Sequence, residues 1–393
     1  MKKQPIRVLL VEDSPVAIVI LKRILNSASD IQVVGTALTG LEGLKMIPRV
    51  LPDVICTDLH MPQMNGLEFI EQVMGNCPRP ILVISASVQP ENKQNLFDLL
   101  AAGAIDVFPK LRAGISANND AAIQQELITK VRILSGVSVF TLRRTRHGEI
   151  GLLSPTPTKP VSISTAKKSS PFKFIPQIPL KQPAENSVVG RSPQQTTAQF
   201  SRQRYRIVTI GASTGGPQAL QTILSQLPAK FPVPVICIQH ISQGFLQGLV
   251  DWLARESRLP IKIAPCGEVP QSGHIYFTPE GKHLEFDRDG RFIYSSSAPY
   301  SGHRPSVTVT FNSIAKYYGR TSVGILLTGM GRDGADGMQA IAGSGGLTIA
   351  QDEESSVVFG MPKEAIALNA ATHVLPVQEI APFLVNRLFC HDL

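Results

Sequence analysis

The stretch that most constrains the fold of this chain runs from Ile207 to Pro217, with the sequence IVTIGASTGGP. A short apolar segment rich in β-branched residues predicts a buried strand. The sequence then changes abruptly to small residues and resumes with apolar residues at helical spacing up to Leu224. We therefore expect Ser213 in a turn between the carboxyl end of a strand and the first turn of a helix. In an open parallel sheet, ligands bind at such turns.

Two interpretations of this turn are open from the stretch alone. Unpaired N–H groups at the start of a helix could stabilise a developing negative charge, which makes Ser213 a candidate nucleophile. Glycine-rich turns between a strand and a helix more often bind phosphate. Other parts of the sequence are needed to distinguish a nucleophile from a phosphate-binding turn.

Length and charge limit the class of protein. A chain of 393 residues predicts two or three domains. The whole excess of positive charge behind the net +8 lies in residues 136–204, which hold 11 Lys+Arg and 2 Asp+Glu. Both flanking regions are nearly neutral, so neither resembles a basic domain that binds nucleic acid.

The chain carries no signal for a membrane or for export. No apolar run reaches the roughly 18 residues that a membrane span needs. The N-terminal residues lack the cleavage pattern of a signal peptide. We therefore expect a cytoplasmic protein that does not insert into a membrane.

Residues 1–135 alternate short apolar runs with amphipathic stretches, which predicts a domain of five β-α units. The expected strands are Ile6–Val11, Val33–Ala37, Asp53–Thr57, Ile81–Ser85 and Ile105–Phe108. The expected helices are Pro15–Ser27, Leu41–Val50, Gly66–Met74, Glu91–Ala102 and Ala121–Leu134. Short connections between such units imply a parallel sheet covered on both faces, with all carboxyl ends along one edge.

Five side chains fall at that edge. Glu12 and Asp13 end the first strand, Asp58 the third and Ser85 the fourth, and Lys110 follows the fifth. Three converging carboxylates repel one another unless a cation lies among them, and hard oxygen ligands suit Mg²⁺. The pattern predicts that Asp58 attacks a phosphoryl group, whose charge the metal and Lys110 offset while Ser85 donates a hydrogen bond.

Residues 1–135 resemble a response-regulator receiver domain, a flavodoxin-like fold. The stretches VEDS at 11–14, TDLHMPQMNG at 57–66 and VISAS at 83–87 match its acidic pair, its phosphoacceptor loop and its switch hydroxyl. The resemblance implies Mg²⁺-dependent phosphorylation at Asp58. The chain departs from the family at Leu111, where a proline is usual.

Residues 136–204 show no sustained hydrophobic period and include eight prolines between Pro155 and Pro193. Such a segment cannot bury enough apolar surface to offset its conformational entropy. We expect a flexible linker rich in proline, serine and basic residues. It separates the first domain from a second one at 205–393.

Strands and helices alternate again from Tyr205, which predicts a second doubly wound, mainly parallel α/β domain. Besides 207–212, the expected strands are Pro234–Gln239, Ile275–Thr278, Leu284–Asp287, Arg291–Tyr294, Ser322–Leu327, Leu347–Ala350 and Thr372–Leu375. The expected helices are Gln218–Leu224, Phe245–Ser257, Val307–Tyr318 and Met338–Ala342. Two of the strands form a hairpin through Arg288, Asp289 and Gly290.

Three of these strands end in Ser213, in His240 and in the loop that contains Asp333. A serine nucleophile needs a base, and the base needs a carboxylate that orients it. His283 and His303 compete with His240 as the base, but both lie among polar residues, where an exposed histidine is usual. His240 directly follows an apolar strand, which favours it.

The carboxylate is less well determined by the sequence. Asp333 and Asp336 share one loop, and spacing alone hardly separates them. Either could instead cap the helix that follows.

Residues 205–393 resemble the catalytic domain of chemotaxis protein-glutamate methylesterases, the CheB family. The matching stretches are IGASTGGP, IQHIS, GHRPSV at 302–307, ILLTGMGRDGADGM and VVFGMPKEAI. The resemblance implies that Ser213 is the nucleophile, His240 the base and Asp333 its carboxylate partner. It also implies oxyanion donors from the backbone N–H groups of Thr214 and Met330. Thr308 stands where members often carry aspartate, which bears on local substrate contacts.

Together the two resemblances imply a response regulator whose output is an enzyme. Phosphorylation by a chemotaxis histidine kinase would activate hydrolysis of glutamate γ-methyl esters on the cytoplasmic helices of chemoreceptors. Methanol would be released, and receptor glutamines would also be deamidated. We expect Mg²⁺ for the phosphorylation and no cofactor for the ester hydrolysis.

Two other functions are compatible with parts of the sequence. A DNA-binding regulator fits the receiver and the basic linker, but 205–393 offers no basic recognition helix. A catalytically silent nucleotide-binding module fits GASTGG, but it leaves His240 and Asp333 unexplained and lacks the G-x-G-x-x-G spacing.

Overall fold

The computed structural model describes residues 4–85, 93–110, 117–137, 139 and 205–389. The expected linker, 136–204, falls almost entirely outside the described residues, and so does Leu111.

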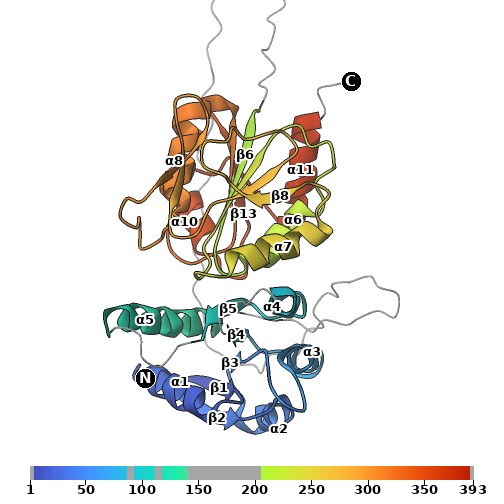
Figure 1. Ribbon diagram of the computed structural model, residues 1–393, viewed down its shortest axis with the longest axis vertical. Helices are drawn as coiled ribbons and strands as arrows, with labels where there is room; N and C mark the ends of the chain where they lie inside the picture. Colours follow the sequence, from blue (N-terminus) through green and yellow to red (C-terminus); the bar gives the residue numbers. More distant parts are fainter. Residues whose placement is uncertain (1–3, 86–92, 111–116, 138, 140–204, 390–393) are drawn as a thin grey trace, which may run out of the picture. The chain divides into compact units, whose positions relative to one another are not determined.

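The N-terminal region is a five-stranded parallel sheet in the order β2-β1-β3-β4-β5. Figure 1 shows helices on both of its faces. The strands are Ile6–Val11 (β1), Ile31–Ala37 (β2), Val54–Thr57 (β3), Ile81–Ser85 (β4) and Asp106–Pro109 (β5). The helices are Pro15–Asn26 (α1), Gly40–Val50 (α2), Gly66–Asn76 (α3), Lys93–Ala101 (α4) and Ala117–Leu134 (α5). All ten predicted elements of this region are present, with ends displaced by a few residues.

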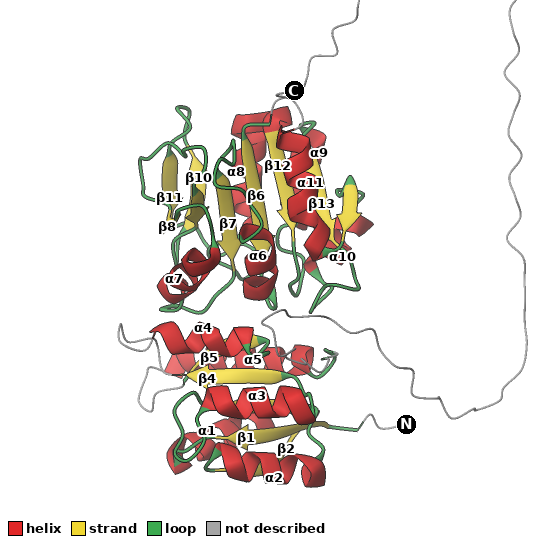
Figure 2. Cartoon of the chain, turned by 90° about the vertical axis from the view of Figure 1, so that its right-hand side faces the viewer, coloured by secondary structure: helices red, strands yellow, loops and turns green. Residues whose placement is uncertain are grey.

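The C-terminal region contains a seven-stranded parallel sheet in the order β14-β13-β12-β6-β7-β9-β8. Figure 2 shows these strands side by side. They are Ile207–Ala212 (β6), Val235–Gln239 (β7), Ile261–Ile263 (β8), Ile275–Phe277 (β9), Ser322–Leu326 (β12), Leu347–Gln351 (β13) and His373–Leu375 (β14). Every pairing within this sheet is parallel, as the predicted doubly wound fold requires.

Helices cover both faces of this sheet. They are Gly216–Leu224 (α6), Leu246–Glu256 (α7), Val307–Tyr318 (α8), Ala335–Gly343 (α9), Met361–Ala367 (α10) and Val377–Phe389 (α11), and a short 3₁₀ helix, Gly319–Thr321 (η1), follows α8. In Figure 1, α6, α7 and α11 lie on one face and α8 and α10 on the other. Successive side chains of β6 point to opposite faces of the sheet. Val208 and Ile210 therefore belong to one apolar cluster and Ile207 to the other.

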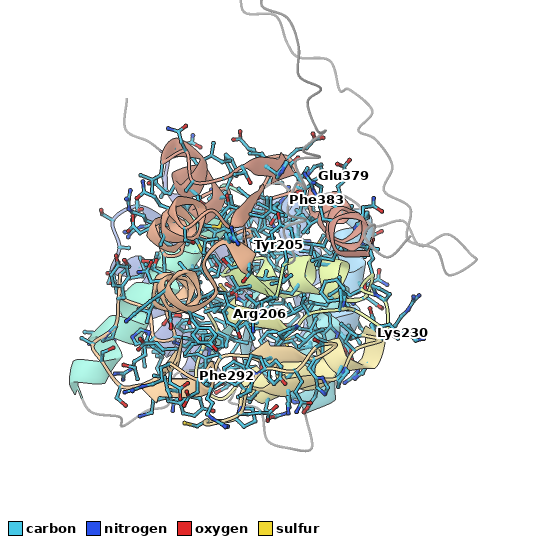
Figure 3. The ribbon with its side chains drawn as sticks, turned by 90° about the horizontal axis from the view of Figure 1, so that it is seen from above. Tyr205, Arg206, Lys230, Phe292, Glu379 and Phe383 are labelled. Atoms are coloured by element: carbon cyan, nitrogen blue, oxygen red, sulfur yellow. The ribbon has the colours of Figure 1, made fainter. Side chains whose placement is uncertain are left out.

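The predicted hairpin is present as a separate antiparallel pair, His283–Phe286 (β10) and Phe292–Ser295 (β11). Four elements were not predicted: β8, η1, α10 and α11. β8 has only three residues, and α10 and α11 begin next to prolines or contain one, which obscures a helical pattern. Figure 3 labels Phe383 of α11, whose ring lies 4.8 Å from that of His373, between centroids.

Candidate active site

Ser213 directly follows β6, at the carboxyl edge of the C-terminal sheet. The chain leaves β6 for β7 on one side, whereas β12 pairs with β6 on the other, so Ser213 lies at a topological switch point. The backbone N–H of Ser213 donates to Thr328 O (3.0 Å), which ties it to the loop after β12. Gly215 has φ = 75° and precedes the first residue of α6. Glycine tolerates this left-handed conformation, so the helix can begin immediately behind the serine.

His240 lies at the end of β7, where its backbone N–H donates to Ala212 O (3.0 Å). Its Nε2 is 2.8 Å from Oδ2 of Asp333. Nδ1 of the same ring is buried and has no hydrogen-bond partner among the residues that the structure describes. With the proton on Nε2 donated to the carboxylate, Nδ1 carries a free lone pair that can accept a proton.

Asp333 is almost completely buried, with 1% of its surface exposed. Besides His240, it accepts hydrogen bonds from Ser306 Oγ (2.7 Å) and from the backbone N–H groups of Val307 (2.8 Å) and Thr308 (3.0 Å). The last three come from the N-terminus of α8, so the helix dipole also favours a negative charge there. Burial alone would raise the pKa of Asp333, but His240 and these donors hold it well below its usual range. Asp333 is therefore a carboxylate that is ionised and fixed in position.

Asp336, the rival carboxylate, points elsewhere. Its Oδ1 lies 2.7 Å from Arg332 Nη2, and its Oδ2 accepts from Tyr300 Oη at 3.4 Å. The structure thus brings Asp333, and not Asp336, to the histidine.

The two rival histidines are not the exposed residues that the sequence suggested. His283 is completely buried; its Nδ1 accepts from Ser306 N (3.2 Å) and its Nε2 faces Ala298 O (3.3 Å). Both nitrogens therefore serve the backbone that leads into α8. His303 is partly buried, and its ring stacks on that of His240. The prediction failed because polar sequence neighbours do not reveal what packs on a side chain from distant elements.

Gln239 is a residue of this site that the sequence analysis did not single out. It is buried, and its Nε2 donates to Ser213 O (2.8 Å) and to His240 O (2.9 Å). One amide group thus holds the backbone of both residues. A polar residue as the last member of an otherwise apolar strand was the available signal.

The loop after β12 lies close to Ser213 and adds the backbone N–H group of Met330 to that of Thr214. Gly329 lies so close that an added Cβ would be 2.6 Å from Ser213 Cβ, which explains glycine there. The N–H groups of Thr214 and Met330 donate to no carbonyl or side chain within the described ranges. Ser213, His240, Thr214 and Met330 all line one cavity. Two unused N–H donors beside a serine are suited to bind an oxyanion.

Thr308 faces the protein interior and not a substrate. It is completely buried, and its Oγ1 accepts from Gly334 N (2.7 Å), the residue after Asp333. Its own N–H donates to Asp333. Thr308, which departs from the family pattern, therefore holds the loop of Asp333 by hydrogen bonds in the protein interior.

The acidic residues of the N-terminal region converge as predicted. Glu12, Asp13 and Asp58 each offer one oxygen within 4.8 Å of the others. Asp58 and Glu12 are buried and Asp13 is exposed. Oε2 of Glu12 is buried without a hydrogen-bond partner among the described residues. An orphaned carboxylate oxygen in a set of hard ligands fits Mg²⁺.

Lys110 lies between two of these carboxylates. Its Nζ is 2.6 Å from Glu12 Oε1 and 2.9 Å from Asp58 Oδ2. Burial raises the pKa of Glu12, although the bond to Lys110 opposes this shift. Burial would lower the pKa of Lys110, but its bonds to both carboxylates raise it overall. Ser85 ends β4 and is buried. An ammonium group held beside a carboxylate can pair with the phosphoryl oxygens once the carboxylate becomes an acyl phosphate.

Among the described residues, no helix is both long and apolar enough to cross a membrane.

Two family models match the chain. The model of the response regulator receiver domain matches residues 8–113, and that of the CheB methylesterase matches residues 208–384. Neither the DNA-binding regulator nor the silent nucleotide-binding module is supported by these matches.

Relatives match over nearly the whole chain. A protein-glutamate methylesterase/protein-glutamine glutaminase from Nitrosospira multiformis is 40% identical, covering 97% of this chain and 96% of its own. Another, from Syntrophus aciditrophicus, is 38% identical over 97% of this chain and 98% of its own. A crystal structure of the CheB methylesterase catalytic domain of Thermotoga maritima is 38% identical and covers 46% of this chain and 98% of its own, with a TM-score of 0.45. This chain belongs to the family of protein-glutamate methylesterases/protein-glutamine glutaminases that carry a receiver domain.

Proposed function

We propose that this chain hydrolyses γ-methyl esters of glutamate side chains on chemoreceptors, with Ser213 as nucleophile, and that phosphorylation of Asp58 activates it. It is a carboxylic ester hydrolase with a response-regulator domain, as its family membership shows. The observation that carries the assignment of residues is the hydrogen bond between His240 and the buried Asp333 beside Ser213.

In the first half of the reaction, Nδ1 of His240 takes the proton of Ser213 while Oγ attacks the ester carbonyl carbon. The negative charge that develops on the carbonyl oxygen is stabilised by the N–H groups of Thr214 and Met330. His240 then gives the proton to the departing methoxide, so methanol leaves and a glutamyl ester of Ser213 remains.

In the second half, His240 takes a proton from water as the water oxygen attacks the glutamyl ester. The proton returns to Ser213 Oγ, and the receptor glutamate is released. Asp333 stabilises the imidazolium through both halves. With a glutamine side chain the same steps release ammonia in place of methanol, which accounts for deamidation.

Phosphorylation uses the carboxyl edge of the N-terminal sheet. Glu12, Asp13 and Asp58 would hold Mg²⁺, which when bound offsets the charge of the phosphoryl group. Asp58 attacks the phosphorus of a phosphohistidine on a chemotaxis kinase; the P–N bond breaks, and the kinase histidine leaves as neutral imidazole. Lys110 then pairs with the new acyl phosphate, and the hydroxyl of Ser85 donates to one of its oxygens. With a kinase as phosphodonor and the cytoplasmic helices of receptors as substrate, both proposed reactions would take place in the cytoplasm.

Substitution of the three residues tests the assignment. Ser213→Ala should abolish methanol release from methylated receptor membranes and labelling by a fluorophosphonate. His240→Ala should be nearly as severe, since triad residues act together. Asp333→Asn should lower kcat by roughly 10³–10⁴-fold, because the amide favours the wrong imidazole tautomer.

Asp336→Asn is the matched control in the same loop and should retain most of the activity. A severe effect of Asp336→Asn together with a mild effect of Asp333→Asn would contradict the proposed triad.

A further inference from the structure

His303 lies in face-to-face contact with the ring of His240. The two ring centroids are 3.8 Å apart and the planes are inclined by only 5°. Both rings line the cavity that also contains Ser213. We propose that His303 is a positioning residue for the catalytic base. Its neutral imidazole ring fixes the plane of the His240 ring and stabilises the protonated form of His240 during turnover. This inference rests on the proposed role of His240 as the base.

The hydrogen bonds of His240 alone leave its ring incompletely held. Nε2 is anchored to Asp333, but Nδ1 has no partner within the described part of the chain. A ring fixed at one atom can still pivot about that bond. Contact across the whole face removes this freedom, so Nδ1 keeps the orientation in which it can accept the serine proton.

His303 is presented by a tight turn and not by a loose loop. Tyr300 and His303 exchange backbone hydrogen bonds of 3.1 and 2.9 Å, and the two central residues, Ser301 and Gly302, have φ of 51° and 83°. Two positive φ values in succession are typical of the type I′ turn. Tyr300 Oη also reaches Asp336 on α9 (3.4 Å). The stacked ring is therefore held from its own backbone.

The segment after His303 is anchored as well. Nη1 of Arg304 donates to the carbonyls of Ser296 and Ser297, both at 3.3 Å, and Pro305 is buried. The chain is therefore anchored on both sides of His303.

The charge state of His303 suits this role. Burial, with a smaller contribution from His240, lowers the pKa of His303 to about 4. The ring is therefore neutral at the pH where a histidine base works. A neutral aromatic face attracts a cation, whereas a second imidazolium at this distance would repel the one that forms on His240.

Three substitutions separate the parts of the proposal. His303→Phe keeps a flat neutral ring, His303→Ala removes the ring, and His303→Arg replaces it by a flat group with a permanent charge. Each is made in the full chain, phosphorylated with acetyl phosphate and Mg²⁺. Methanol release from methylated receptor membranes is measured over a range of pH to give kcat and KM.

The phenylalanine variant should stay within about threefold of the wild type. The alanine variant should lose about 5- to 30-fold in kcat with little change in KM, the range expected for one cation–π contact. The arginine variant should lose more, and the acidic limb of its kcat/KM profile should move to lower pH, because a fixed positive charge opposes protonation of the base. A merely structural role would lower the rate without moving that limb.

His274→Arg is the matched control for charge. His274 precedes β9 at the amino edge of the sheet, opposite Ser213, and stacks on Tyr276 at 6.1 Å between centroids. It should leave kcat and the pH profile unchanged. Thermal unfolding of each variant shows whether it folds, and if the arginine variant does not, the comparison of phenylalanine with alanine decides.

Two results would overturn the inference: a phenylalanine variant as impaired as the alanine variant, which would mean that a ring nitrogen is needed, or wild-type rates in both. Ser213→Ala measured beside them separates this failure from failure of the proposed function. If Ser213→Ala remains active, the triad itself is wrong.

Discussion

At the scale of single residues, burial combined with specific donors sets the charge states in this protein. Asp333 is buried, yet four hydrogen bonds keep it ionised. His303 is partly buried beside another imidazole, and this burial lowers its pKa, so the ring is neutral. Hydrogen-bond donors outweigh the effect of burial on Asp333 and keep its carboxylate ionised. For His303, burial outweighs the opposing effect of Asp333 and favours the neutral ring.

The low pKa of His303 predicts a pH dependence of stability. In an unfolded chain histidine titrates near pH 6.5, whereas burial lowers the pKa of His303 to about 4 in the folded protein. Between these values the unfolded state binds more protons, so the free energy of unfolding rises as the pH increases from about 4 to about 6.5. In His303→Phe the free energy of unfolding should rise less over this pH range, by an amount on the order of 1–3 kcal/mol.

Fluorescence of Trp252 provides the measurement. It is the single tryptophan in the sequence and lies buried in α7, so it reports unfolding of the C-terminal region by denaturant. Equal slopes for wild type and variant between pH 4 and 6.5 would contradict the assigned shift.

The proposed phosphorylation also rests on one residue, Asp58. Asp58→Asn should abolish acyl-phosphate formation from acetyl phosphate and Mg²⁺ but leave the basal esterase rate. Asp53→Asn is the matched control, because Asp53 directly precedes the same strand and binds the backbone of Arg7 (2.8 Å) at its opposite end. Incorporation of phosphate by Asp58→Asn at the wild-type rate would point to Glu12 or Asp13 as the acceptor.

At the scale of elements, α8 is both a structural helix and part of the candidate site. Its N-cap residue, Ser306, accepts from Val309 N (3.3 Å) and donates to Asp333 (2.7 Å). His283 on β10 receives the N–H of Ser306 and so links the hairpin to the same helix end. The position of the carboxylate therefore depends on how a helix begins.

Ser306→Ala should consequently affect stability and rate together. Loss of the cap should lower the free energy of unfolding by about 1 kcal/mol. Loss of one donor to Asp333 should lower kcat by about tenfold. Thr39→Ala removes a comparable N-cap, from α2, where Thr39 accepts from Glu42 N (3.2 Å). It should cost similar stability and leave the esterase rate unchanged; equal rate losses in both variants would contradict a specific role of Ser306.

At the scale of the whole molecule, a receiver and a hydrolase share one chain and are separated by a predicted linker of about 60 residues. Tethering gives the two a high effective concentration, so a weak interaction suffices for regulation. A difference of roughly 2–3 kcal/mol between the phosphorylated and unphosphorylated states would convert a mostly restrained enzyme into a largely active one.

A cut in the linker therefore tests the coupling. Residues 193–393, released by a protease site placed after Ser192, should have a higher basal rate of methanol release than the unphosphorylated full chain. Modest shortening of the linker should change little, because closure entropy varies slowly with loop length. Equal rates for the fragment and for the full chain with and without acetyl phosphate would mean that the receiver does not control the rate.

Much of the architecture is determined by local pattern. Strands such as β1, β4 and β6 are apolar runs bounded by small or polar residues, so hydrophobic period alone predicts them. Since parallel strands end at one edge, the sequence also predicts that Glu12, Asp13 and Asp58 converge, and that Ser213 and His240 share an edge. Short or proline-containing elements, β8, α10 and α11, give no comparable signal.

Only the tertiary structure decides which side chains meet across loops. Asp333 and Asp336 are three residues apart with similar neighbours, yet one faces the N-terminus of α8 and the other Arg332. The stacking of His303 on His240 joins a turn to a strand end 63 residues earlier in the chain. Sequence patterns report whether a residue is helical, extended or apolar over a few positions. Contacts of this kind depend on how whole elements pack, and no local period encodes that.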